Sequence, residues 1–207
     1  MNSKRFDIAL AIGGAAGQGI ATPGNVLARL FTRRGLYVNA YNAYQSIVRG
    51  GHIFLTIRIS DERILSHGDK LDLLMCLNQD TMDRHLGLMG PGTRVVFNSD
   101  TITPGDAAEG AQLCPMPIGE LSGGSRNKVM QNTIALGVVT YLLDLEFDVL
   151  GSALEHQFGS KGQDTVDENT VAARAGYDYA AANFEPYPDP IASGEKPLAL
   201  WTGNDAL

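Results

Sequence analysis

The chain has few of the residues that hold metals or iron–sulfur clusters. Its 207 residues include only two cysteines, Cys76 and Cys114, which lie far apart and form no C-x-x-C pair. An iron–sulfur cluster needs about four thiolates at close spacing, so we expect no cluster in this chain. Each cysteine lies in an apolar segment, which predicts buried structural thiols. The four histidines follow no metal-binding spacing, so we predict no metal site either.

Long hydrophobic runs and known catalytic motifs are also missing. No apolar stretch approaches the roughly 20 residues of a membrane span, and the N-terminus lacks the apolar segment of a signal peptide. We therefore expect a cytoplasmic protein that binds neither membrane nor nucleic acid, in keeping with a net charge of −7. The serines lack a G-x-S-x-G elbow and no pair of carboxylates stands out, so we assign no catalytic residue.

Acidic residues are absent from one long stretch. Between Asp7 and Asp61 there is no Asp or Glu, whereas arginines give this stretch a formal charge of +5. The arginines are Arg29, Arg33, Arg34, Arg49 and Arg58. A local positive field on an acidic protein suits a phosphate-bearing ligand or an acidic partner surface. For the first three of them, solvation and capping of a single helix is an equally good explanation.

The most informative segment that is present is rich in glycine. An apolar run at 8–12 is followed by Gly13-Gly14-Ala15-Ala16-Gly17-Gln18-Gly19 and then by a helical apolar pattern. We predict a strand, a tight turn and a helix, with Thr22 as the helix cap. Glycine allows positive φ and a close approach of the backbone to a ligand, and a helix N-terminus favours an anion. The candidate cofactor-binding residues are therefore Gly14, Gly17, Gln18 and Gly19.

Two other interpretations of this turn remain open. The dinucleotide fingerprint G-x-G-x-x-G has a middle glycine where this chain places Ala16. The next strand segment, 37–41, also lacks the acid that binds a ribose, so an NAD or flavin domain is a weaker alternative. The third interpretation is a turn that packs tightly and binds nothing, in which case the chain would be a ligand-free assembly module.

The rest of the chain alternates strand and helix patterns, which predicts an α/β fold. We expect strands at 37–41, 52–59, 71–77, 94–97 and 113–116, and helices at 79–88, 125–143, 150–158 and 166–183. This alternation is typical of a single three-layer domain with a mainly parallel sheet flanked by helices. The strand at 52–59 follows a glycine loop rather than a helix, which allows a locally antiparallel or edge position. The segment 120–128 is either a capped helix start or a second ligand loop.

A second glycine pair leads to a family resemblance. Residues 44–52 read Tyr-Gln-Ser-Ile-Val-Arg-Gly-Gly-His, and with the upstream Gly-Gln-Gly this segment resembles the gamma module of the 2-oxoacid:ferredoxin oxidoreductases. Further similar positions follow in order, namely Arg58 to Asp61, Leu71 to Leu74, Asn132, Leu136-Gly137, Asn169 and Gly176-Tyr177. The resemblance covers residues 6–185.

The resemblance implies that the chain is one subunit of an enzyme and is inactive alone. Such enzymes oxidatively decarboxylate a 2-oxoacid, such as pyruvate, 2-oxoglutarate or 2-ketoisovalerate, on thiamine diphosphate and form an acyl-CoA. Electrons pass through iron–sulfur clusters to ferredoxin or flavodoxin. The chain carries no motif of a thiamine-diphosphate subunit, so we expect that cofactor and the clusters in partner alpha and beta chains. This chain is expected to contribute coenzyme A binding and subunit assembly.

Four residues are predicted to contact a partner or ligand. Arg49, Gly50 and Gly51 combine a cation with a segment that bends sharply, so the guanidinium is expected to reach a defined partner. Asn132 lies inside a predicted helix, where asparagine is mildly unfavourable. Its side chain is either solvated or bonded to a neighbouring loop, and the resemblance favours the bonded arrangement.

The composition changes after about residue 184. Residues 1–185 are predicted to form the gamma-type domain, and residues 186–207 an extended Pro-rich linker and docking tail. The end of the tail, which contains Trp201, resembles the first strand and turn of the alpha module that many family members fuse behind the gamma module. The exposed tryptophan and the basic stretch both resemble contact surfaces, so we expect the isolated chain to form a two-fold homodimer.

Overall fold

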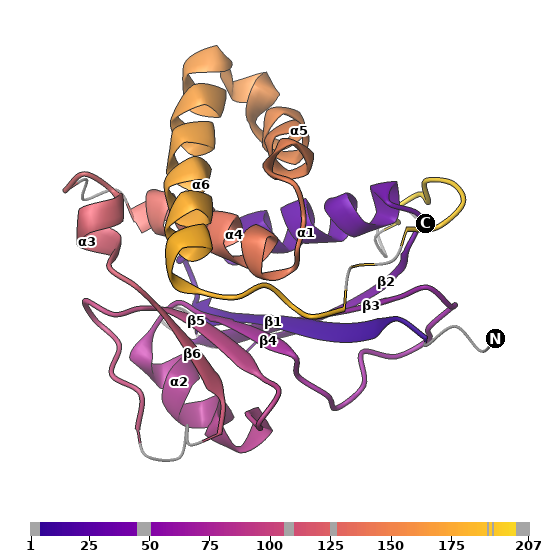
Figure 1. The fold of residues 1–207 in the computed structure, drawn as a ribbon, viewed down its shortest axis with the longest axis horizontal. Helices are drawn as coiled ribbons and strands as arrows, with labels where there is room; N and C mark the ends of the chain where they lie inside the picture. The colour runs from indigo at the N-terminus through magenta and orange to yellow at the C-terminus, as the bar shows by residue number, and fades with distance from the viewer. Residues whose placement is uncertain are drawn as a thin grey trace.

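The fold is organised around a sheet of six strands. The computed structural model describes residues 5–44, 51–105, 110–124, 128–189, 191 and 193–201. The strands lie in the order β2-β3-β1-β4-β5-β6 (Figure 1). Their bounds are Asp7–Ala15 (β1), Tyr37–Tyr44 (β2), His52–Ser60 (β3), Leu73–Cys76 (β4), Arg94–Asn98 (β5) and Gln112–Met116 (β6).

The sheet is mainly parallel, with one strand reversed. Strands β1, β4, β5 and β6 run parallel, whereas β3 is antiparallel to both of its neighbours, β1 and β2. This confirms the parallel sheet and the locally antiparallel strand that the sequence predicts. Only seven residues separate the end of β2 from the start of β3, which is too few for the crossover that a parallel connection needs, so β3 runs in the opposite direction. Its pairing with β1 extends from Asp7↔Ser60 to Ala15↔His52, so β3 begins where β1 ends.

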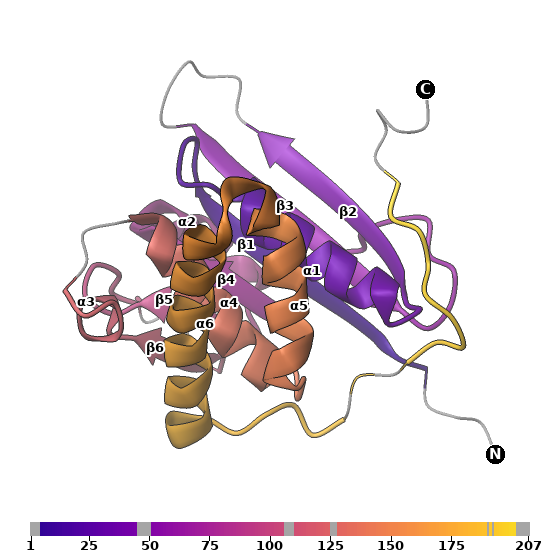
Figure 2. The same ribbon diagram turned by 90° about the horizontal axis from the view of Figure 1, so that it is seen from above.

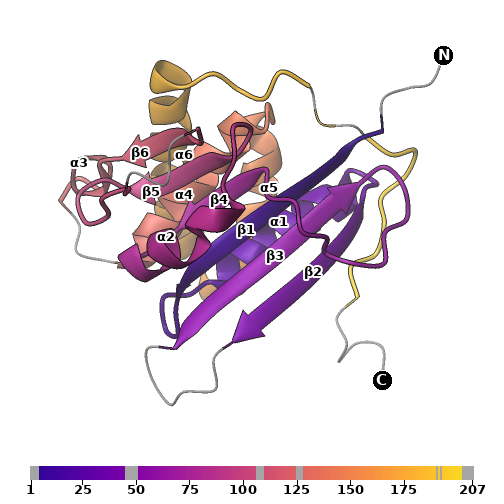
Figure 3. The ribbon, with the colours of Figure 1, turned by 90° about the horizontal axis from the view of Figure 1, so that it is seen from below.

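Helices cover the two faces of the sheet unequally. The helices are α1 (Ala21–Arg33), α2 (Gln79–His85), α3 (Ile118–Leu121), α4 (Lys128–Leu142), α5 (Phe147–Phe158) and α6 (Gln163–Asn183). Figure 1 shows α1, α4, α5 and α6 above the sheet and α2 below it, and Figure 2 shows the upper helices from above. Seen from below, none of the helices in the described residues covers β2 and β3 on the face of the sheet where α2 lies (Figure 3). These layers confirm the predicted three-layer α/β domain.

Burial explains the apolar run of β1 and the state of the cysteines. Leu10 packs in the core under the helix layer and Ala11 packs in a smaller core under α2, so both faces of β1 are covered. Cys76 and Cys114 are buried in these two cores, on opposite faces of the sheet. Burial raises the pKa of Cys76 to about 12 and that of Cys114 to about 11. Both thiols are therefore protonated at neutral pH, which confirms them as buried structural thiols.

The predicted cap of α1 is wrong. The helix begins at Ala21, so Thr22 lies inside it, and the cap position belongs to Ile20, whose side chain is buried and caps nothing. The chain enters the helix earlier because Gly19 turns it with φ of +75° and leaves Ile20 in helical geometry. The bounds of other helices and strands differ from the predicted ones by a few residues. The short helix α3 includes the start of the predicted loop 120–128, of which residues 125–127 lie outside the described residues.

Helices α4 and α6 pack unusually closely. A Cβ built on Gly137 would lie 1.9 Å from the carbonyl oxygen of Ala173, and one built on Gly176 would lie 2.0 Å from a carbonyl oxygen of α4. Across the same contact, Oγ1 of Thr133 donates a hydrogen bond to Oδ1 of Asn169 at 2.7 Å. The late Asn and Gly positions of the family resemblance therefore form the interface between these two helices.

On the opposite face of the sheet, two histidines join β3 to α2. The Nε2 atoms of His52 and His85 are 2.8 Å apart, so one ring donates a hydrogen bond and the other accepts it. The ring of His85 also stacks on Phe54 with a centroid distance of 3.7 Å. Burial and the neighbouring His52 lower the pKa of His85 to about 4, and burial lowers the pKa of His52 despite Asp80 nearby. The pair is therefore neutral at pH 7.

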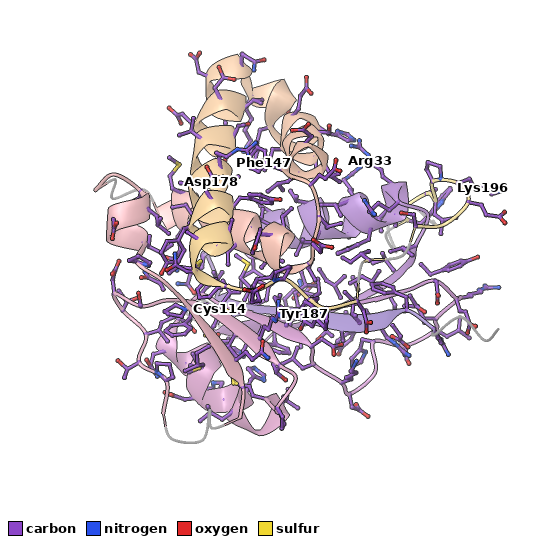
Figure 4. The ribbon with its side chains drawn as sticks, in the orientation of Figure 1. Arg33, Cys114, Phe147, Asp178, Tyr187 and Lys196 are labelled. Carbon is purple, nitrogen blue, oxygen red and sulfur yellow. The ribbon has the colours of Figure 1, made fainter. Side chains whose placement is uncertain are left out.

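The described part of the C-terminal tail lies against the domain. The hydroxyl of Tyr187 donates to the carbonyl of Asp72, and its amide donates to the carbonyl of Leu142 at 2.8 Å. The guanidinium of Arg94 lies 4.1 Å from the centre of the Tyr187 ring. Figure 4 shows Tyr187 between the helix layer and the sheet. Trp201, at the end of the described tail, is 68% exposed.

Replacing Gly137 by alanine is expected to lower the free energy of unfolding by about 1–3 kcal/mol, because the new methyl group overlaps a carbonyl group and forces α4 and α6 apart. Urea unfolding measures the change. The matched control is Gly151→Ala in α5, where a Cβ meets nothing, so alanine is expected to stabilise the protein by about 0.5–1 kcal/mol. Equal stability of Gly137→Ala and the wild type would contradict the close packing.

The histidine pair is expected to make stability depend on pH. Because the pKa of His85 is depressed in the folded protein, the unfolded chain binds more protons below about pH 6.5, and stability falls as the pH is lowered toward about 4. His85→Gln is expected to remove about 1 kcal/mol of the loss measured between about pH 7 and pH 5, a modest figure because the ring is partly exposed. An unchanged pH dependence in His85→Gln would contradict the neutral pair.

Candidate functional site

The carboxyl ends of β1 and β4 meet where the chain changes from one face of the sheet to the other. Helix α1 leaves β1 above the sheet and α2 leaves β4 below it (Figures 1 and 3). In open α/β sheets, ligands bind at such a switch point, outside the carboxyl ends of the strands. The segments that follow the two strands, 16–20 and 77–81, line this position.

The turn at 16–20 has a backbone that requires glycine. Gly17 and Gly19 have φ of +91° and +75°, which other residues rarely adopt. A Cβ built on Gly17 would meet nothing within 4 Å, so the backbone is open on that side. A Cβ on Gly14 would lie 2.7 Å from Oε1 of Gln18. Gly14 therefore makes room for the Gln18 side chain, whereas Gly17 leaves the turn accessible from outside.

The side chain of Gln18 braces the turn from inside. Its Oε1 accepts hydrogen bonds from the amide of Ala15 at 2.6 Å and from Nδ2 of Asn78 at 3.1 Å. Its Nε2 donates to the carbonyl of Leu77 at 3.4 Å. The carboxamide thus joins the turn after β1 to the segment after β4, and its polar atoms are used within the protein.

Asn132 of α4 supports the same turn from the helix layer. The side chain of Asn132 is buried. Its Nδ2 donates hydrogen bonds to the carbonyl of Gln18 at 2.7 Å and to the carbonyl of Gly19 at 3.4 Å. The predicted bond from Asn132 to a neighbouring loop is therefore confirmed. Because its backbone belongs to a packed helix, this asparagine fixes the turn against the body of the domain.

Asn78 is a residue of this site that was not among those predicted from the sequence. Its Oδ1 accepts hydrogen bonds from the amide and the hydroxyl of Thr81 at 2.9 and 2.8 Å, so Asn78 caps α2 while it also bonds to Gln18. Thr81 in turn lies against Gly13, where a Cβ would be 2.2 Å from its methyl group. An asparagine directly after an apolar strand and before a polar helix start is a capping signal that could have identified it.

The turn presents backbone donors that lack acceptors. Within the described chain, the amides of Gly17 and Gly19 have no hydrogen-bond acceptor, whereas that of Gln18 donates to the carbonyl of Ala15 at 3.0 Å. The first turn of α1 contains no acidic residue, and its cap residue supplies no side-chain bond. The positive end of the α1 dipole therefore faces this turn without a compensating charge from α1. An anion placed against the turn would be stabilised by the unpaired amides and by the positive end of the helix dipole.

Gly51, the last residue of the Arg-Gly-Gly segment, lies at the same position. The carbonyl of Gly51 accepts a hydrogen bond from the amide of Ala16 at 2.9 Å, which attaches the start of β3 to the glycine turn. Arg49 and Gly50 lie outside the described residues. The structure therefore brings Gly51, Gln18 and Asn132 together at one end of the sheet.

The groups at this site can bind and orient a ligand. The groups that converge on the turn are amides and carboxamides, which do not transfer protons at neutral pH. Across the described ranges, no group of three or more His, Cys, Asp or Glu side chains is placed to hold a metal ion. None of the helices in the described part of the chain is long and apolar enough to cross a membrane.

Comparison with curated proteins finds relatives that are longer than this chain. The ketoisovalerate oxidoreductase subunit VorA of Methanothermobacter thermautotrophicus is 28% identical over 183 residues, which is 86% of this chain and 38% of that subunit. The 2-oxoglutarate oxidoreductase subunit KorA of Mycobacterium tuberculosis is 28% identical over 180 residues, 73% of this chain and 27% of that subunit. The chain thus spans about two fifths or less of the length of these relatives.

Solved structures share the fold. The 2-oxoglutarate:ferredoxin oxidoreductase of Magnetococcus marinus was solved with 2-oxoglutarate, coenzyme A and succinyl-CoA bound. It superposes on this chain with a TM-score of 0.84 at 25% identity, and the match covers 94% of this chain and 34% of the Magnetococcus chain. The gamma subunit of the keto/oxoacid ferredoxin oxidoreductase of Geobacter sulfurreducens has a TM-score of 0.64 at 23% identity, covering 84% of this chain and 99% of that subunit. At that identity the second likeness shows the fold alone.

Most of the chain matches one protein family. The sequence matches the pyruvate ferredoxin/flavodoxin oxidoreductase family over residues 9–179, which includes the glycine turn, the Arg-Gly-Gly segment and the interface of α4 with α6. Because this match covers most of the chain, the protein belongs to the pyruvate ferredoxin/flavodoxin oxidoreductase family.

Proposed function

We propose that the chain is the gamma-type part of a 2-oxoacid:ferredoxin oxidoreductase and that its glycine turn holds phosphate groups of coenzyme A. The observation that carries this proposal is the pair of amides on Gly17 and Gly19, which lack acceptors among the described residues at the positive end of α1. Gln18 and Asn132 hold these amides in place. The coenzyme A bound in the solved Magnetococcus marinus relative supports the same ligand here.

The remaining chemistry is assigned to partner chains. When bound, coenzyme A supplies the thiol that takes up the acyl group. Cys76 and Cys114 do not fit an iron–sulfur cluster, since they are buried on opposite faces of the sheet with raised pKa values. Thiamine diphosphate and the clusters therefore belong to the alpha and beta chains, and ferredoxin or flavodoxin accepts electrons through the complex. Arg49, two residues before the Gly51 that bonds the turn, is proposed to contact coenzyme A or a partner chain.

The alternative functions have less support. An NAD domain needs an acid at the end of the second strand, and the end of β2 reads Asn-Ala-Tyr. In an assembly module that binds no ligand, the amides of Gly17 and Gly19 would have no acceptor other than water or a partner chain. The family membership favours the oxidoreductase subunit over both.

We also propose that the isolated chain forms a two-fold homodimer. Strand β2 is the edge of the sheet and carries no charged residue along its length, which is an unprotected edge. Tyr41 and Tyr44 on this strand are exposed, as is Trp201 in the tail. These surfaces are typical of contacts that are covered in an assembly.

Gly17→Ala is expected to weaken coenzyme A binding by the assembled enzyme at least about tenfold, because its methyl group enters the space where the phosphates approach. Calorimetry on the folded complex measures the affinity. The matched control is Gly162→Ala, since Gly162 has a similar φ of +101° and open space around it but lies at the start of α6. Wild-type affinity in Gly17→Ala would place the coenzyme A site elsewhere.

Because thiamine diphosphate and the clusters are assigned to partner chains, we predict that activity depends on those chains. Purified anaerobically, the chain is expected to show no iron–sulfur absorbance and to reduce neither ferredoxin nor a viologen dye with any 2-oxoacid and coenzyme A. Addition of the alpha and beta chains is expected to produce activity. Turnover by the isolated chain, or a bound cluster in its spectrum, would contradict the subunit assignment.

A further inference from the structure

A cavity lies between the C-terminal half of α1 and the N-terminal half of α5. It has a volume of about 380 Å³. Leu30 and Ala153 give it an apolar part, and Arg33, Arg34, Asp148 and Ser152 give it polar walls. Since α1 has 13 residues, its two ends are about 20 Å apart, so this cavity is separate from the glycine turn at the start of the helix.

Arg34 contributes a donor without an acceptor. Its Nε atom is buried and has no hydrogen-bond partner among the described residues. The rest of the side chain is held in place, because Nη2 donates to Oγ of Ser193 at 3.1 Å, and the tail also bonds the Arg34 carbonyl through the amide of Gly194 at 2.7 Å. These bonds hold the positive charge of Arg34 beside the cavity that its side chain lines.

Arg33 adds a second positive charge at the same cavity. It is exposed, it makes no ion pair within the described chain, and it extends from the last turn of α1 on the side where α5 lies (Figure 4). Asp148 supplies the one carboxylate among the described residues that line the cavity, and no ion pair joins it to either arginine in the described part of the chain. Two cations against one carboxylate leave the cavity with a net positive charge.

We propose that this cavity binds a small organic anion. A carboxylate or phosphate group is attracted by the guanidinium groups of Arg33 and Arg34, whose planar geometry matches that of an oxyanion. A short apolar body attached to that group lies against Leu30 and Ala153. The inference does not depend on the proposed coenzyme A site, and it gives Arg33 and Arg34 a role beyond solvating the end of α1.

The test uses the 207-residue chain with two probes, inorganic phosphate and 3-methylbutanoate, and follows the backbone amides of α1 and α5 by NMR. The wild type is expected to bind at least one probe at millimolar concentration, with shifts at the cavity walls that are separate from any shifts at the glycine turn. Arg33→Gln is expected to weaken binding about tenfold, since it removes a hydrogen bond to a charged group. Asp148→Asn is expected to strengthen binding about threefold, since it removes the only like charge in the wall.

Arg63→Gln is the matched control, because Arg63 is an exposed arginine away from the cavity. Stronger binding of 3-methylbutanoate than of phosphate would identify a carboxylate on an apolar body as the ligand, and the reverse would identify a phosphate. Binding that Arg33→Gln and Arg63→Gln weaken equally would overturn the proposal, as would the absence of shifts with both probes. Shifts at the amides of Gly17 and Gly19 report on the coenzyme A proposal, whereas shifts along α5 report on this one, so failure of the coenzyme A proposal and failure of this one are distinguishable.

Discussion

Three carboxamide side chains hold the backbone of one glycine turn, and the proposed function depends on them. A turn in which two amides have no acceptor among the described residues has few internal bonds to keep its shape. Gln18 supplies bonds from within the turn, Asn78 connects it to the next parallel strand, and Asn132 connects it to α4. The amides of Gly17 and Gly19 are thereby positioned before any ligand arrives, which reduces the entropy that binding must remove.

The position of Asn132 depends in turn on the packing of the helix layer. Helix α4 lies where it does because Gly137 and Gly176 let its backbone and that of α6 approach to a distance that no side chain would allow. The Thr133–Asn169 hydrogen bond adds a polar link to this contact. Residues far from the glycine turn in the sequence therefore determine its geometry, and the family pattern includes both groups.

The sequence predicts those features that depend on local periodicity and on glycine. Alternating apolar segments predict the strands and helices, and the glycine loop before residue 52 predicts the reversed strand β3. Features that depend on tertiary contacts are less accessible. The cap prediction for Thr22 fails because the positive φ of Gly19 starts the helix early, and the double role of Asn78 follows from the pairing of β1 with β4. The cavity beside Arg33 requires the packing of α5 on α1, which no pattern in either helix specifies.

The central claim is that backbone amides of this chain bind phosphate groups of coenzyme A, and the amides themselves report on it most directly. The measurement is a titration of the ¹⁵N-labelled chain with coenzyme A, followed through the amide resonances of Gly17 and Gly19. The account predicts that these two resonances shift most and that desulfo-coenzyme A, which keeps the phosphates, produces the same shifts. Resonances of the turn that stay unchanged at saturation, with shifts elsewhere in the domain, would contradict it.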